Sequence, residues 1–231
     1  MLHAARLASA LAVSATLASL TACQPMRMQV DPSLTDDRMS VSGPGFLERG
    51  QLTFGEFSAG SIDRSWTSST STRILSHERT RSKQSYRFVF AARGVVTDRV
   101  ACQTVYAETA HDFGTLRVDN GRHGLGCVLT AADGRPRGEL LMTERERHRP
   151  SGRMIHDGTP IEVIPRMRGE NTRWDMLEPV GYELRVDGAV LGAVQTINGG
   201  AVWIDRTAPA ALQESAAVAA ATLLLYESLD S

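Results

Sequence analysis

The hydrophobic pattern of the chain changes character near the C-terminus. Residues 216–226 are almost all apolar and strong helix formers, with Thr222 as the one polar member along most of the run. A helix that is apolar on every face is buried in protein or in lipid. The polar residues 213–215 precede the run directly, and a bilayer span needs about 20 apolar residues. The pattern therefore predicts a core helix over residues 209–229.

The chain before this run predicts many short strands and no second helix of this kind. Runs of β-type residues occupy 51–57, 61–67, 84–91, 95–106, 115–119, 125–131, 138–143 and 161–167. The Ser/Thr tract 67–72 is expected to be a loop that runs into a strand, with an edge strand as the alternative. Turns are predicted at 119–121 and at 133–134, where Asp, Asn and Gly interrupt the apolar runs.

The clearest local pattern directly precedes the helix. Three strands, 182–186, 190–197 and 201–204, are separated by Asp-Gly at 187–188 and Asn-Gly-Gly at 198–200. These turn sequences favour tight hairpins because both central residues of a type I′ turn need positive φ. Thr207 and Pro209 then suit a helix cap and a first-turn proline.

The fold class predicted from these patterns is mainly β. It is a many-stranded antiparallel sheet or barrel, of roughly eleven to thirteen strands, with one apolar C-terminal helix buried in or against it. This order of elements resembles the tubby C-terminal-like fold shared with phospholipid scramblases, in which the terminal helix threads the barrel. The resemblance covers about residues 51–229 and implies no functional residue, because it rests on element order alone. A lipocalin-like barrel is the alternative, but its outside helix would need a polar face.

Composition fits a single globular domain. The chain has 231 residues, of which 42% are hydrophobic and 22% are charged, so one substantial core is expected. The formal net charge of −1 argues against a nucleic-acid partner bound through bulk charge.

The first 22 residues have the layout of a secretory signal, with His3 and Arg6 before an apolar stretch at 7–20. The ending Leu20-Thr21-Ala22-Cys23 resembles the lipobox of bacterial lipoproteins. The resemblance implies cleavage before Cys23, a diacylglycerol on its thiol and a further acyl chain of the palmitate type on its amine. Two or three chains give stable membrane anchoring.

The residue after the cysteine bears on the destination of a lipoprotein. Gln24 stands where an Asp tends to retain family members in the inner membrane, so the resemblance implies an outer-membrane lipoprotein whose body faces the periplasm. The expected organisation is a signal peptide over 1–22, the lipidated cysteine with a flexible tether over 23–50, and one periplasmic β-rich domain over 51–231.

Cys102 and Cys127 remain once Cys23 is assigned to the anchor. Both lie in strand-like sequence, and an oxidising compartment favours a disulfide between them. Two separate buried thiols are the alternative. A zinc or redox pair is disfavoured, because the spacing fits neither Cys-x-x-Cys nor a zinc template.

Local motifs for catalysis or metal binding are missing from the sequence. There is no Gly-x-Ser-x-Gly, no His-x-x-x-His and no phosphate-binding loop, and the pairs His111-Asp112 and His156-Asp157 adjoin turn residues, so both are interpreted as surface turns. We therefore expect no enzyme activity, no metal and no cofactor. A hydrolase with a dispersed site is an alternative. It would require two or more of His77, His111, His123 and His156 to converge on a carboxylate or serine.

Basic residues alternate in two places. Arg79, Arg81 and Lys83 form one set, and Arg145, Arg147 and Arg149, interleaved with two glutamates, form the other. One hypothesis is a strip that contacts anionic lipid or lipopolysaccharide phosphates. The other, which the interleaved glutamates favour, is a solvated strand face whose charges prevent edge pairing.

Together these patterns predict a non-catalytic, lipid-anchored envelope protein that binds or scaffolds another envelope component. Its expected partners are the membrane, through Cys23, and an envelope protein or lipid. The alternative from a different class is a carrier whose barrel holds a lipid or another small apolar ligand.

Overall fold

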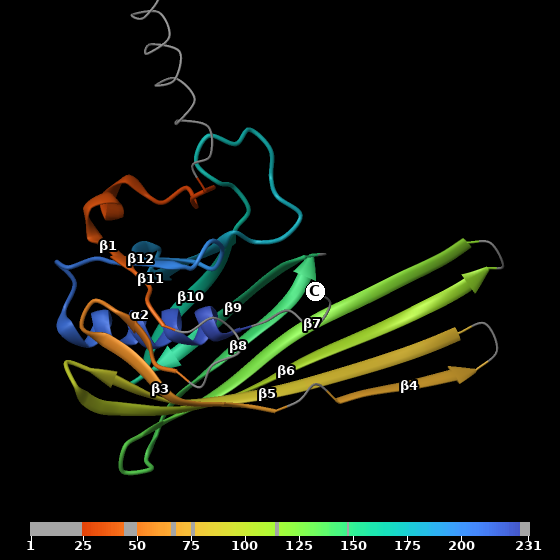
Figure 1. Ribbon diagram of the computed structural model, residues 1–231, viewed down its shortest axis with the longest axis horizontal. Coiled ribbons are helices and arrows are strands. Elements are labelled where there is room, and N and C mark those ends of the chain that lie inside the picture. The colour runs from red at the N-terminus through yellow and green to blue at the C-terminus, as the bar shows by residue number, and fades with distance from the viewer. Residues whose placement is uncertain are drawn as a thin grey trace, which may run out of the picture.

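One large antiparallel sheet dominates the computed structural model, which describes residues 25–43, 50–65, 68–74, 77–113, 116–146 and 148–226 (Figure 1). The strands are β1 (Arg38–Ser40), β2 (Leu52–Phe54), β3 (Phe57–Arg64), β4 (Ser68–Ile74), β5 (His77–Ala92), β6 (Val95–Phe113), β7 (Leu116–Ala131), β8 (Pro136–Glu146), β9 (Arg149–His156), β10 (Thr159–Arg166), β11 (Gly181–Val186), β12 (Ala189–Gln195) and β13 (Ala201–Ile204). A 3-10 helix, η2 (Pro32–Asp37), precedes β1, and the helix α2 (Ala210–Leu225) follows β13.

The sheet curls into a nearly closed barrel. Its order is β1-β13-β12-β11-β10-β9-β8-β7-β6-β5-β3-β2, with β4 paired to β5 outside this path. Two backbone hydrogen bonds between Ser42 and Thr53, of 2.9 and 2.7 Å, connect the chain after β1 to β2. Since β1 and β2 are the two ends of the path, this bridge brings the edges of the sheet together.

Helix α2 forms the core around which the strands curve. Every residue from Ser215 to Leu223 is buried, and the helix contacts β3, β5, β12 and β13. Apolar side chains such as Phe88, Leu140 and Leu184 belong to the same core cluster. The predicted class, a mainly β fold with one buried apolar C-terminal helix, is confirmed.

The start of this helix differs from the prediction. Pro209 occupies the cap position without a side-chain hydrogen bond, and Thr207 instead bonds to the Asp205 carboxylate at 2.8 Å from its backbone nitrogen and 2.6 Å from its hydroxyl. The predicted Thr207 cap is therefore wrong, because the hydroxyl is used in the turn before the helix. The helix ends at Leu225, and residues 227–229 of the predicted span lie outside the described residues.

The three strands before the helix agree with their prediction. Asp187 and Gly188 have φ of 51° and 81°, and Asn198 and Gly199 have φ of 53° and 79°. Positive φ at both central positions is what a type I′ turn requires.

Other strand boundaries differ from those predicted. β7 runs unbroken through the turn expected at 119–121, because Asn120 and Gly121 pair with Thr109 and Glu108 of the long neighbouring strand β6. The 67–72 tract is mostly strand, since β4 pairs with β5 over its full length, so the edge-strand alternative applies. The run 51–57 contains a hairpin turn between β2 and β3, and β9 was not predicted.

The N-terminal segment is part of the domain. Met28 and Leu34 are fully buried against Ala193 and Trp203, and β1 pairs with β13. Residues 26–42 therefore pack on the barrel where a flexible tether was expected. The sequence did not predict this packing, because the segment has no regular spacing of apolar residues. It is held by single buried side chains such as Met28 and Leu34.

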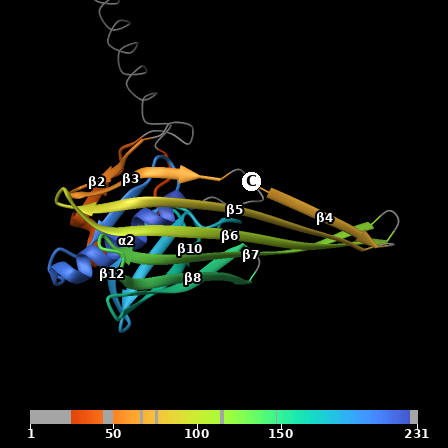
Figure 2. The same cartoon turned by 90° about the horizontal axis from the view of Figure 1, so that it is seen from below.

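Three strands extend beyond the part of the barrel that the helix fills. β5, β6 and β7 have 16, 19 and 16 residues, and with β4 they project to one side of the molecule (Figures 1 and 2). We call this projection the arm and define it by β4 and residues 77–83, 105–113 and 116–124, which pair with one another.

Candidate functional site

A buried polar cluster joins three distant parts of the chain inside the barrel. Asp98 of β6, His156 at the end of β9 and Ser215 of α2 have side chains that are 0%, 1% and 3% exposed. His156 Nδ1 lies 2.7 Å from Ser215 Oγ, and His156 Nε2 lies 3.1 Å from Asp98 Oδ1. The three residue types are those of a serine, histidine and aspartate triad, but the ring nitrogens are exchanged, because in that triad Nε2 faces the serine and Nδ1 faces the aspartate.

Each group of the cluster is placed by its own element. His156 is the last residue of β9, immediately before the Asp157-Gly158 turn, where both residues have positive φ. Ser215 lies in the second turn of α2, where its hydroxyl donates to the Ala211 carbonyl at 2.9 Å, a common bond for serine within a helix. The same hydroxyl lies within hydrogen-bond distance of His156 Nδ1, so Ser215 connects the helix backbone to the imidazole ring.

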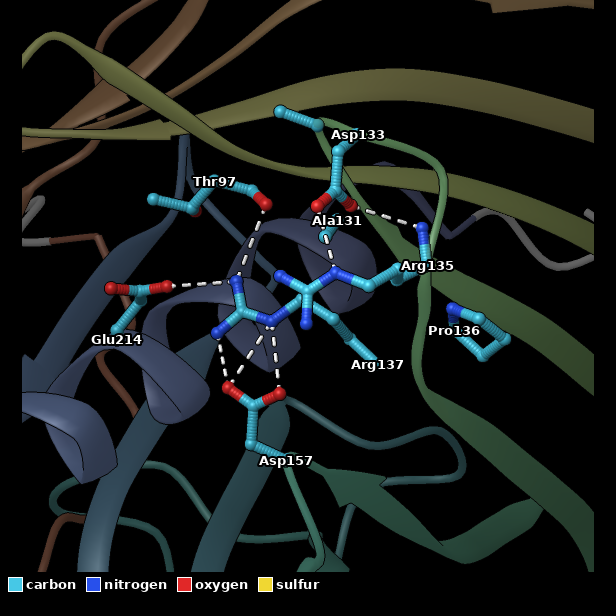
Figure 3. A pocket seen from close by; sticks show the side chains of 9 residues that line it. Thr97, Ala131, Asp133, Arg135, Pro136, Arg137, Asp157 and Glu214 are labelled. Carbon is cyan, nitrogen blue, oxygen red and sulfur yellow. Dashed lines mark hydrogen bonds and ion pairs between the residues drawn. The ribbon is translucent and has the colours of Figure 1, made fainter.

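Arg137 of β8 connects this cluster to groups nearer the surface, and Figure 3 shows its contacts with Thr97, Glu214 and Asp157. Its Nη1 donates to Asp98 Oδ2 at 2.9 Å, to Glu214 Oε1 at 3.1 Å and to the Thr97 carbonyl at 3.3 Å. Its Nε lies 3.0 and 3.1 Å from the two oxygens of Asp157. Strands β6 and β8, the β9–β10 turn and the first turns of α2 are thus held by one guanidinium, whose planar fork suits several acceptors.

The charges around Arg137 shift one another's ionisation. The hydrogen bond to Asp157 raises the pKa of the Arg137 guanidinium, and the Asp98 and Glu214 carboxylates add to this. The same hydrogen bond lowers the pKa of Asp157. Arg137 and Asp157 therefore both remain charged near neutral pH.

A surface pocket of about 500 Å³ lies above this network and is lined by Thr97, Ala131, Ala132, Asp133, Arg135, Pro136, Arg137, Asp157 and Glu214. Its charged side chains are bonded to one another: Arg135 to Asp133 at 2.7 Å, and Arg137 to Asp157 and Glu214. A ligand would have to replace these ion pairs, so the pocket offers weak selectivity for a charged molecule.

Access decides what the buried cluster can do chemically. Ser215 and His156 are not part of the pocket wall, and both are almost completely enclosed. A nucleophile must reach its substrate within about 3.5 Å, which this serine does not do while α2 stays in the barrel. The arrangement fits a structural connection between strands and helix. Of the four histidines named for a dispersed hydrolase site, His156 is the one whose side chain is described, and it contacts both a serine and a carboxylate.

The other three histidines are described by backbone only. His77 and His111 pair in register on β5 and β6, and His123 pairs with Tyr106. Within the ranges that the structure describes, no group of three or more His, Cys, Asp or Glu residues could hold a metal ion.

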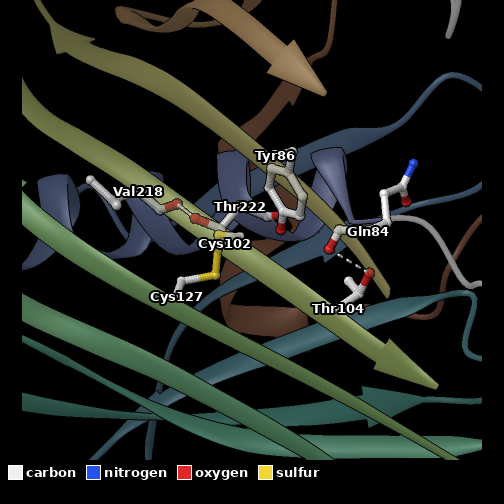
Figure 4. The surroundings of a disulfide bond; sticks show 7 residues. All are labelled: Gln84, Tyr86, Cys102, Thr104, Cys127, Val218 and Thr222. Atoms are coloured by element: carbon white, nitrogen blue, oxygen red, sulfur yellow. Dashed lines mark hydrogen bonds between the residues drawn. A yellow bond between two sulfur atoms is a disulfide. The ribbon is translucent and has the colours of Figure 1, made fainter. Parts of the chain in front are cut away.

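The two cysteines assigned to a disulfide are brought together. Cys102 of β6 and Cys127 of β7 are direct register partners with Cα atoms 4.0 Å apart, and their sulfurs form a disulfide (Figure 4). Next to them the Tyr86 hydroxyl donates to the Thr222 carbonyl of α2 at 3.0 Å. Burial raises the pKa of Tyr86, so this phenol remains a donor. A smaller hollow of about 370 Å³ is lined by Tyr86, Cys102 and neighbouring polar residues.

The two sets of alternating basic residues lie on different parts of the structure. Arg79, Arg81 and Lys83 lie on the β5 part of the arm, where Lys83 is exposed. Arg145 lies on β8, separated from β5 by β6 and β7, and Arg147 is outside the described residues. Arg149 of β9 pairs with Asp175 at 2.9 Å, so it belongs to a different surface.

The polar network itself was not predicted from the sequence. His156 lies 58 residues from Asp98 and 59 from Ser215, and no local spacing connects them. The one signal in the sequence was a polar Glu214-Ser215 step at the start of an otherwise apolar run. Cys23, the expected lipidation site, lies outside the described residues.

The arrangement was compared with known proteins once its geometry was defined. Helices in the described part of the chain are all too short or too polar to cross a bilayer. Comparison of the chain with protein-family models, with curated proteins and with solved structures gives no significant match.

Proposed function

We propose that the chain is a lipid-anchored lipoprotein of the bacterial outer membrane. In this proposal Cys23 carries the lipid, and the β-domain faces the periplasm and binds or scaffolds another envelope component without catalysis. The observation that carries the proposal is the sequence Leu20-Thr21-Ala22-Cys23 at the end of an apolar signal-like segment.

Two structural features support this proposed location. The Cys102–Cys127 disulfide suits an oxidising compartment such as the periplasm. The chain also joins the folded domain soon after Cys23, since the Met26 carbonyl accepts a hydrogen bond from Asn198 Nδ2 at 2.7 Å. A domain attached this closely to a lipidated cysteine would be held at the membrane surface.

The arm supports a binding or scaffolding role. It presents long strands beyond the packed barrel, and within the described ranges β4 pairs with β5 and with no other strand. An exposed edge strand can accept a strand from a partner through backbone hydrogen bonds. Its residues are largely polar, which favours a protein partner over an apolar ligand.

The carrier alternative is weakened by the position of α2. The helix occupies the interior in which a lipocalin-like barrel would hold its ligand, and its residues from Ser215 to Leu223 are buried. Lipid extraction of purified protein followed by mass spectrometry tests this alternative. Stoichiometric lipid that is not attached to Cys23 would favour a carrier.

The anchor is tested by metabolic labelling with palmitate. The wild-type chain should incorporate label and fractionate with outer membranes, whereas Cys23→Ser should do neither. Cys102→Ser is the matched control, because it removes a different cysteine and should leave labelling intact. Equal labelling of Cys23→Ser and wild type would refute the lipobox assignment.

A further inference from the structure

We infer that the loop between β10 and β11, residues 167–180, is a membrane-contacting surface that inserts into the lipid bilayer interface beside the N-terminal segment. Trp174 and Leu177 are 75% and 85% exposed, the highest values among the large hydrophobic side chains of the described residues, and Met176 is 38% exposed. A long loop without regular structure that exposes neighbouring apolar side chains is typical of a binding surface.

Hydrogen bonds and ion pairs fix the backbone of this loop. Trp174 and Leu177 are therefore exposed on an ordered loop. Met176 N donates to the Met167 carbonyl at 2.8 Å, and Thr172 Oγ1 donates to the Gly169 carbonyl at 2.9 Å. Asp175 accepts from Arg168 at 2.7 Å and from Arg149 of β9 at 2.9 Å. The loop therefore presents Trp174 and Leu177 on a defined support.

The occupant is indicated by where the N-terminal segment lies. Glu170 N donates to the Arg27 carbonyl at 2.7 Å, and Gln29 N donates to the Arg168 carbonyl at 3.1 Å. Gly169 packs so closely on this segment that a Cβ there would lie 2.6 Å from Met26 Cγ. Residues 26–29 thus run alongside the loop, as Figure 1 also shows.

The distance from the proposed anchor is short. Three residue steps separate Cys23 from Met26, which span at most about 10 Å. This step rests on the proposed function: if Cys23 carries lipid, the loop lies within reach of the bilayer interface. Tryptophan is enriched at that depth, because its ring is apolar and its N–H is a donor.

Charge in the loop favours insertion through apolar contact. Asp175 is paired with Arg168 and Arg149, and the exposed Arg173 is offset by Glu170 and Glu178. The surface is therefore close to neutral and does not depend on anionic lipid. Binding is expected to persist at high salt, unlike a contact made through the arginines of the arm.

The test uses the full chain with vesicles of phosphatidylethanolamine and phosphatidylglycerol that carry brominated acyl chains. Brominated vesicles should quench the Trp174 emission, and unbrominated vesicles should shift it to the blue. In the wild-type chain both effects should change little between low and high salt. Both should be lost in Trp174→Phe. Leu177→Ser should reduce the quenching. Leu141→Ser, which changes an exposed leucine of the barrel wall, is the matched control and should not reduce it.

The outcomes separate this inference from the anchor. Palmitate labelling of Cys23 with no quenching of Trp174 overturns the inference and leaves the anchor intact. Quenching without labelling supports the loop as a membrane contact and overturns the anchor. Quenching that disappears at high salt assigns the contact to charged residues and overturns apolar insertion. Crosslinking in cell envelopes gives the last outcome. If an envelope protein is crosslinked to wild type but not to Leu177→Ser, and wild type shows no quenching, the membrane inference is overturned in favour of a protein partner.

Discussion

At the scale of single residues, the most informative feature is a serine, histidine and aspartate arrangement that is closed to solvent. Asp98 accepts from His156, Arg137 and Thr97, so both of its oxygens are satisfied inside the barrel. A buried carboxylate is tolerable when it is paired and hydrogen-bonded in this way. The cluster therefore stabilises the packing of α2 against the strands through buried hydrogen bonds.

Replacing Ser215 tests this role. Ser215→Ala leaves His156 Nδ1 without its partner, so the free energy of unfolding is expected to fall by about 1 to 3 kcal/mol. Thr222→Val is the matched control, because Thr222 Oγ1 bonds only within the helix, to the Val218 carbonyl at 2.9 Å. Urea denaturation measures both variants. A Ser215→Ala variant with unchanged stability would contradict the structural role.

The Arg137–Asp157 contact predicts a pH dependence of stability. Because the pKa of Asp157 is lower in the folded chain than in the unfolded chain, its contribution is present above the ordinary aspartate pKa of about 4 and is lost as the pH falls further. Chemical denaturation at several pH values from about 6 to about 2.5 should show wild type losing more stability than Asp157→Asn. Parallel curves for the two proteins would be the contrary result.

At the scale of elements, one helix decides the architecture. α2 has no polar face along its buried part, and it is enclosed by strands from both halves of the chain. Its hydroxyls and carbonyls are used locally or by single strand residues, such as Tyr86. The helix is stable because the sheet removes the apolar surface of residues 215–223 from water.

A charge in the middle of this helix should therefore unfold the domain. Val218 is fully buried, and Val218→Asp places a carboxylate without a partner in the core. Ala211→Asp is the matched control, since Ala211 is exposed in the first turn, where a negative charge suits the helix dipole. Thermal denaturation followed by circular dichroism should show a cooperative transition for Ala211→Asp alone. A cooperative transition in Val218→Asp would exclude the central-helix architecture.

At the scale of the whole molecule, the N-terminal segment fixes how the domain stands relative to any anchor at Cys23. Met28 N donates to Gln195 Oε1 at 2.9 Å, and β1 completes the sheet beside β13. Because so few residues separate Cys23 from this packed segment, the proposed lipid and the 167–180 loop belong to the same side of the molecule.

The packed segment is tested by Met28→Ala. Removal of a fully buried methionine side chain is expected to lower the free energy of unfolding by about 2 to 5 kcal/mol. Met176→Ala, at an exposed methionine, should change it by less than about 0.5 kcal/mol. Equal and small effects in both variants would mean that residues near Met28 form a loose tether after all.

The sequence by itself determined the parts of this protein that depend on neighbouring residues. The sequence predicted helix α2, the turns at Asp187-Gly188 and Asn198-Gly199, and the strands around them. This was possible because the spacing of apolar residues and the preference for positive φ are both set by neighbouring residues. The proposed lipobox is equally local, because the proposal rests on four consecutive residues.

Only the tertiary structure decided the rest. The turn expected at Asn120-Gly121 became strand because β6 offers a full ladder of partners, and pairing across strands outweighs a weak local preference. The Asp98–His156–Ser215 cluster joins residues about 60 positions apart in each step, so it exists only once the barrel closes around the helix. The position of the loop with Trp174 and Leu177 was also decided by folding, which places this loop beside residues 26–29.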